Sequence, residues 1–189
     1  MGRRLGEGGP SIDWRIMAVG GVLLVGIIVL VVLLLFGGGG ASGSLSGTRQ
    51  VDDGRGHVAV GAKGGPYSSV PATSGTHWDT PGQWGVYTSA NPAIEDQMVH
   101  NLEHGGIVIW YQPGQVDPSG ISKLEQWVQQ QQQTTRYKAV VSPWTGQDFG
   151  HPVAVTAWDW LLYLDSVDIS AVQQFFDDHY GKSPEPNGA

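Results

Sequence analysis

The sequence predicts an α+β fold, a small mixed β-sheet with packed helices, preceded by one N-terminal transmembrane helix. The transmembrane helix is predicted because residues 16–36 are all apolar or glycine, and a membrane-spanning helix needs about 20 such residues. The α+β class is predicted because helical and strand patterns follow one another without an internal repeat. Eight tryptophans in 189 residues also indicate a packed core or a binding surface.

The N-terminal part is expected to anchor the protein in the cell membrane. Residues 1–15 hold three arginines, and the next basic residue after the apolar segment is Arg49. The positive-inside rule therefore predicts a cytoplasmic N-terminus and a periplasmic or extracellular domain. Cleavable signal peptides have apolar regions of about 7–15 residues, so we interpret residues 16–36 as an uncleaved single-pass anchor. Cleavage near residues 41–43 is the alternative.

The folded domain is expected to span residues 57–181. Before it, the Gly/Ser-rich residues 37–56 predict a flexible tether, and after it the Pro-containing residues 182–189 predict a loose tail. Inside the domain, residues 66–92 show no clear period and are crowded with Pro, Gly, Ser and Thr. So long an irregular segment tends to be functional when it is ordered.

A helix followed at once by a strand is predicted at the centre of the domain. Asn91 is a good N-cap, Pro92 fits the first helical position, and Gly105 can terminate the helix. Residues 107–111 are apolar throughout and predict a buried strand. Any side chain near the end of this helix would therefore lie beside the sheet.

The second half of the domain predicts two more helices and further strands. Apolar residues recur at helical spacing over residues 121–128, the glutamines 129–133 extend that helix on its exposed side, and residues 137–141 predict a strand. Two strand patterns, residues 153–158 and 161–164, predict a hairpin or one bent strand. Asp168 is expected to cap the last helix.

Composition excludes several classes of function. The chain has no cysteine, which removes disulfides, thiolate metal sites and thiol catalysis. A formal charge of −7 argues against a nucleic-acid partner, because such proteins usually carry a basic surface. Histidine, methionine and carboxylates are then the side chains left to bind a metal ion.

Two histidines on the central helix form the strongest candidate site. Positions i and i+4 lie on one face of a helix, so His100 and His104 are expected to bind one metal ion. Glu103 lies beside them as a partner that supports the ligands. The irregular segment offers His77 as the best third ligand, since loops position distant ligands readily.

The remaining ligand positions are predicted from residue type. Met98 is the candidate fourth ligand, although on a regular helix it points to a different face from His100. His57 and His151 are the next candidates after His77. Imidazole suits copper and zinc, a thioether favours Cu(I), and copper binds most tightly among the divalent ions. Copper is therefore the predicted ion, with zinc as the alternative.

Two other interpretations of the helical histidines are open. Residues 100–104 match the H-x-x-E-H pattern of inverted zinc proteases, but a domain of this size argues against a hydrolase. The histidines could also be structural residues at a helix end, where positive charge is favourable. In that case the protein would be an accessory subunit of a larger membrane complex, respiratory or photosynthetic. We predict no catalytic residues and expect the protein not to be an enzyme.

Several motifs together resemble an uncharacterised bacterial family, domain of unknown function 3105. The motifs are residues 73–78 (TSGTHW), 84–87 (WGVY), 98–111 (MVHNLEHGGIVIWY) and 154–158 (AVTAW). The likeness covers roughly residues 56–184 and leaves out the anchor and the tether. It implies a membrane-anchored or exported single domain with matching histidines at His77, His100 and His104. The residues themselves predict copper holding, or delivery of copper to a neighbouring membrane enzyme.

Overall fold

The computed structural model describes residue 2 and residues 45–188. The fold described below belongs to the unit Leu45–Ala189. Within the described part of the chain, no helix is both long and apolar enough to cross a membrane. The predicted transmembrane helix at residues 16–36 lies outside this part and stays a prediction, as does the tether over residues 37–44.

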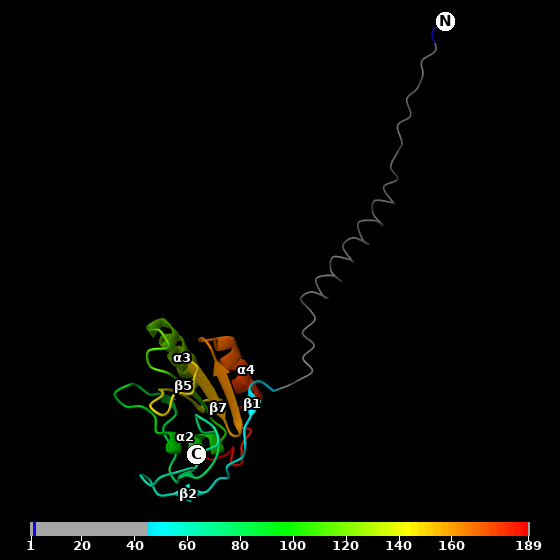
Figure 1. Ribbon diagram of the computed structural model, residues 1–189. Coiled ribbons are helices and arrows are strands. Elements are labelled where there is room, and N and C mark those ends of the chain that lie inside the picture. Colours follow the sequence, from blue (N-terminus) through cyan, green and yellow to red (C-terminus); the bar gives the residue numbers. More distant parts are fainter. Residues whose placement is uncertain (1, 3–44, 189) are drawn as a thin grey trace. The chain divides into compact units, whose positions relative to one another are not determined.

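The centre of the fold is a mixed sheet with the strand order β1-β8-β7-β5-β6-β4 (Figure 1). In chain order the strands are β1 (Thr48–Arg49), β4 (Gly85–Val86), β5 (Ile107–Tyr111), β6 (Ala139–Pro143), β7 (Val153–Ala157) and β8 (Trp160–Leu164). Strand β6 pairs in parallel with β4 and β5, and the other neighbours are antiparallel. The predicted α+β class with a mixed sheet is confirmed.

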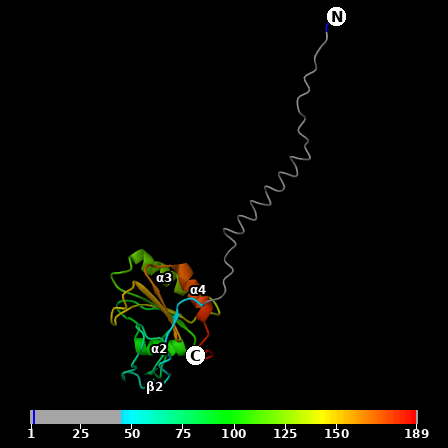
Figure 2. The same ribbon diagram turned by 45° about the vertical axis from the view of Figure 1, so that its right-hand side comes forward.

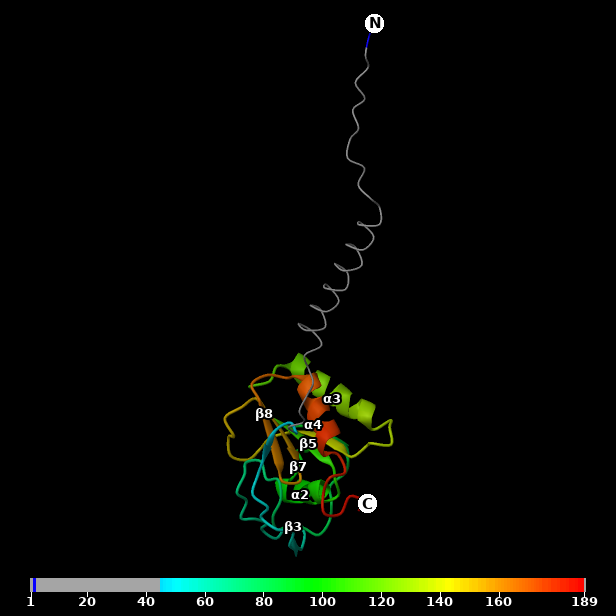
Figure 3. The ribbon, with the colours of Figure 1, turned by 90° about the vertical axis from the view of Figure 1, so that its right-hand side faces the viewer.

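The sheet separates two apolar layers, because successive residues of a strand point to opposite faces. In β5, Ile107 and Ile109 pack in the layer that contains α3 (Pro118–Gln131) and α4 (Ile169–His179). Val108 and Trp110 pack in the other layer, with α2 (Glu95–Glu103). Figures 2 and 3 show α3 and α4 together on one side of the sheet and α2 on the other.

Helices α3 and α4 begin at aspartate caps. Asp168 caps α4 as predicted, because its Oδ1 accepts hydrogen bonds from the backbone N–H groups of Ser170 and Ala171. Asp117 caps α3 in the same way through the N–H of Gly120, at 2.7 Å. The predicted hairpin is also confirmed, since β7 and β8 are antiparallel neighbours joined through Asp159.

The predicted start of the central helix is wrong. Helix α2 begins at Glu95, and its N-cap, Ile94, makes no side-chain capping bond. Asn91 instead exchanges backbone hydrogen bonds with Thr88 in a tight turn. Asparagine is favoured both at helix N-caps and in turns, and Asn91 lies in a turn.

Carboxylates in the first turn of α2 tie the irregular segment to the helix. Glu95 Oε1 accepts a hydrogen bond of 2.7 Å from the N–H of Ala72. Asp96 accepts hydrogen bonds from the N–H of Gly64 and the hydroxyl of Tyr67. Burial raises the pKa of Glu95, the bond from Ala72 lowers it by less, and the charge of Asp96 raises it further.

Glu95→Gln is expected to stabilise the fold at pH 8 more than at pH 5. A carboxyl group with a raised native pKa stabilises the fold while it is protonated, and that contribution is lost as the pH rises through the native pKa. The glutamine carries no charge to bury and still accepts from Ala72. Urea unfolding of both chains at the two pH values measures the difference. Glu125→Gln on α3 is the control, and an equal response of both variants would contradict the explanation.

Gly105 ends α2 with a left-handed backbone, φ +78°, as predicted for a helix terminator. A Cβ at this position would lie 2.8 Å from Gly181 Cα, because the chain after α4 passes close to the helix end. Gly105→Ala is therefore expected to lower the free energy of unfolding by more than the about 1–2 kcal/mol that left-handed strain alone costs.

Gly114 provides the matched control for this prediction. It has a similar φ of +85°, but nothing lies within 4 Å of a Cβ built there. Gly114→Ala should show the strain alone, and denaturant unfolding of both variants measures the excess at Gly105. Equal losses would show that the chain around Gly181 moves aside at no cost.

The folded unit extends past both predicted boundaries of residues 57 and 181. At its start, β1 pairs with β8, and the N–H of Ser46 donates to Asp178 at 2.8 Å. At its end, the N–H of Glu185 donates to the carbonyl of Glu103 at 3.0 Å. The composition of these two segments predicted a flexible tether and a loose tail. Both segments are held mainly by hydrogen bonds of their backbone groups, which do not depend on side-chain type, so composition does not reveal them.

Candidate metal centre

His100 lies in the last turn of α2, in a stretch of the helix that is buried from Met98 to Glu103. Its Nδ1 lies 2.6 Å from the carbonyl oxygen of Trp78. Because a carbonyl oxygen only accepts, Nδ1 carries a hydrogen, and Nε2 of the neutral ring keeps a lone pair for a metal ion.

The surroundings of His100 favour its neutral form. Burial lowers its pKa, and the hydrogen bond to the carbonyl of Trp78 raises it by less. The neighbouring imidazoles of His104, His77 and His57 lower it further. A histidine must be deprotonated to bind a metal, so this environment prepares His100 for that role.

His77 reaches the helix because the irregular segment folds back over it. It lies in β3 (His77–Trp78), which pairs in parallel with β2 (His57–Val58), and the register places His57 directly opposite His77. Nδ1 of His77 lies 2.7 Å from the carbonyl oxygen of Gly75. The same argument as for His100 therefore leaves Nε2 of His77 with a lone pair.

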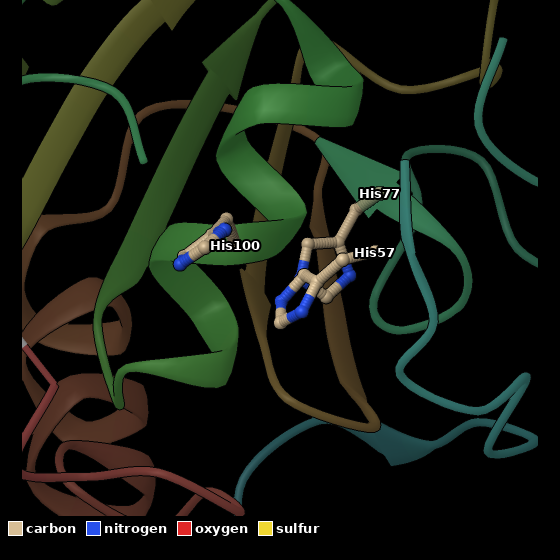
Figure 4. Close-up of side chains that lie close together, drawn as sticks. All are labelled: His57, His77 and His100. Atoms are coloured by element: carbon tan, nitrogen blue, oxygen red, sulfur yellow. The ribbon is translucent and has the colours of Figure 1, made fainter. Parts of the chain in front are cut away.

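Three imidazoles meet beside α2, and we call His57, His77 and His100 the three-histidine cluster. Figure 4 shows that they come from separate segments, His100 from α2 and the others from the neighbouring strands. The ring centroids lie 4.7 Å apart for His57 and His77, 5.0 Å for His57 and His100, and 5.1 Å for His77 and His100. One nitrogen from each ring lies within 4.8 Å of the other two, which suits a shared ion.

Glu103 places a buried carboxylate against this cluster. Its Oε2 lies 3.1 Å from Nε2 of His57 and 3.2 Å from Nε2 of His77. Glu103 is 0% exposed, and its Oε1 has no hydrogen-bond partner in the described part of the chain. As hydrogen bonds, the two contacts of Oε2 need a proton on the imidazole nitrogens. A cation between the same atoms would replace that proton and supply the positive charge that a buried carboxylate requires.

His104 belongs to a second, overlapping group. One atom each of His100, Glu103 and His104 lies within 4.8 Å of the other two, and we call these residues the helix-end group. The rings of His100 and His104 are 4.5 Å apart, as expected for positions i and i+4 at the end of a helix. The structure thus divides the predicted histidines between two groups that share His100.

The two remaining predicted ligands lie in other surroundings. Met98 is buried within the apolar layer around α2, and its terminal methyl group lies against Gly82. His151 lies on a loop, where its Nδ1 is 2.8 Å from Oδ1 of Asp165 and its ring stacks on Tyr163. Of the two second-choice candidates for the third ligand, the structure therefore brings His57 to the helix.

The donor atoms suit a transition metal. Imidazole nitrogens and a carboxylate oxygen are ligands for zinc and for copper. The side chain of His57 is 42% exposed whereas that of His77 is 0% exposed. The cluster therefore has one ligand that a partner or solvent can reach.

Comparisons with known proteins agree with the resemblance found in the sequence. No curated protein and no solved structure matches the chain. The sequence profile described as "Protein of unknown function (DUF3105)" matches residues 62–189, which is well over half of the chain. The matched part contains His77, His100, Glu103 and His104, and His57 lies just before it. The chain belongs to the DUF3105 family.

Proposed function

We propose that this protein is a membrane-anchored, extracytoplasmic metal-binding protein that holds copper and delivers it to a membrane enzyme. The observation that carries the proposal is the convergence of three imidazoles and one buried carboxylate, from three segments far apart in the sequence. Such a set of ligands forms only in the folded chain, and each of its two buried histidines is oriented by a backbone carbonyl.

Copper is preferred over zinc for two reasons. Copper lies above zinc in the order of divalent affinities for nitrogen and oxygen ligands. The exposed ring of His57 also gives an acceptor protein direct access to a ligand, which suits delivery better than a closed structural zinc site. Zinc is the alternative ion.

The proposed location follows from residues 16–36 and the arginines that precede them. An anchored domain outside the cytoplasm would meet incoming ions beside the enzymes that use them. The absence of cysteine is compatible with this compartment, because the site does not depend on a thiol that could be oxidised.

Metal uptake by the full-length chain in detergent tests the proposal. The purified protein is stripped with a chelator, loaded with copper or zinc in turn, desalted, and analysed by plasma mass spectrometry. The wild type should retain copper, and a His57→Ala/His77→Ala variant should lose the ion that the three-histidine cluster binds. His151→Ala removes an exposed histidine outside the cluster and should retain as much copper as the wild type.

The ratio of the two metals tests the choice of ion. In a competition with equal copper and zinc, the wild type should retain mainly copper. Retention of zinc alone would replace copper by zinc in the proposal. No metal in the wild type, with the chain folded by circular dichroism, would overturn it and favour an accessory subunit with structural histidines.

A further inference from the structure

We infer that the site holds two metal ions bridged by the carboxylate of Glu103, the second completed by Glu185 from the C-terminal segment. This inference rests on the proposed metal-binding function and extends it. The first ion would be bound by the three-histidine cluster and Oε2 of Glu103. The second would be bound by Oε1 of Glu103, His104 and Glu185.

Glu103 has the geometry of a bridging ligand. Its Oε2 faces His57 and His77 at 3.1 and 3.2 Å, so that oxygen belongs to the first ion. Its Oε1 is buried and has no hydrogen-bond partner among residues 45–188. A buried carboxylate oxygen with no donor is a costly arrangement that a second cation would relieve.

Three imidazoles and a bridging carboxylate already give the first ion a full shell of four ligands. We assign His104, which lies in one group with His100 and Glu103, to the second ion. Each neutral imidazole has one lone pair, so His100 can serve only one of the two ions. This division uses every member of both groups.

The C-terminal segment brings a second carboxylate to His104. Oε2 of Glu185 lies 3.9 Å from Nε2 of His104, and the N–H of Glu185 donates to the carbonyl of Glu103 at 3.0 Å. The segment is fixed by Lys138, whose Nζ donates to the carbonyls of His104, Pro186 and Gly188 at 3.0, 3.1 and 2.7 Å. The backbone of Glu185 is thus held beside the helix end, and its side chain is partly exposed.

The number of copper ions per full-length chain tests the inference. The wild type should retain two ions, and Glu185→Gln should retain one, because the side chain of Glu185 is 52% exposed and its loss leaves the three-histidine cluster intact. Glu125→Gln, which changes a glutamate on α3, should retain two. A His57→Ala/His77→Ala variant should lose the first ion.

Electron paramagnetic resonance tests the bridge itself. Two Cu(II) ions joined by one carboxylate couple magnetically and give a half-field signal that an isolated Cu(II) ion cannot give. The wild type should show this signal, and Glu185→Gln should lose it and show one uncoupled Cu(II) per chain.

Each outcome has a distinct meaning. Two ions with the half-field signal support the inference, and two ions without it overturn the bridge by Glu103. One ion in both the wild type and Glu185→Gln overturns the inference but leaves the proposed function in place. No bound ion in the wild type overturns both.

Discussion

Copper is expected to raise the free energy of unfolding by about 4 kcal/mol when free metal exceeds the Kd by about 1,000-fold. The stabilisation is large because the ligands come from β2, β3 and α2 and meet only in the native fold. An unfolded chain offers no equivalent site, so binding energy adds to folding energy. The carboxylate of Glu103 is expected to lower the Kd, because a bound ion would supply a partner for its buried Oε1.

Denaturant unfolding with and without copper measures this increment. His77→Ala should remove most of it, because His77 is fully buried and contacts both His57 and Glu103. The variant will also change the stability of the metal-free chain, so the quantity compared is the increment and not the absolute stability. His151→Ala should keep the full increment, and an equal increment in all three chains would show that copper binds elsewhere.

Much of the fold could be predicted from the sequence because its signals are local. The cap at Asp168, the terminator at Gly105 and the apolar strand Ile107–Tyr111 each depend on a few consecutive residues, and all three are confirmed. The sequence-based predictions are wrong where long-range hydrogen bonds determine the structure. Strand β1 forms by pairing with β8, and no pattern in the Gly/Ser-rich segment indicates that pairing.

The candidate site shows the same division between local and long-range signals. Helical spacing places His100 and His104 on one face, and the structure agrees. The partnership of His57 with His77 depends on the register of two strands of two residues each, which leaves no periodic pattern in the sequence. Residue type alone made Met98 a candidate ligand, but the packing of the apolar layer decides where its side chain lies.

The carboxylate bridge that we infer could not be predicted from the sequence either, because it depends on the C-terminal segment. Composition predicted a loose tail from residue 182, whereas the segment is fastened by the ammonium group of Lys138. Burial lowers the pKa of Lys138, which reflects the cost of enclosing its charge. Hydrogen bonds to three backbone carbonyls offset that cost. The sequence does not indicate which carbonyl groups will lie within reach of a lysine.

Lys138→Met is expected to lower the free energy of unfolding by about 2 kcal/mol and to release the C-terminal segment. Methionine preserves the apolar stem of the side chain, so the loss isolates the three hydrogen bonds to the carbonyls of His104, Pro186 and Gly188. Relief from burying the ammonium group makes the net loss smaller than three charged hydrogen bonds would suggest.

Trypsin cleavage after the exposed residue Lys182 reports the release directly. Cleavage should be faster in Lys138→Met than in the wild type and should be detected by mass spectrometry as loss of residues 183–189. Lys123→Met, which changes an exposed lysine on α3, should leave both the stability and the cleavage rate unchanged. If Lys138→Met behaves like this control, the backbone bonds of Gly181 and Glu185 hold the segment on their own.

The copper content of Lys138→Met tests the link between this segment and the second ion. If the segment is released, retention of one copper ion in place of two would show that Lys138 holds the second site together without contacting the metal.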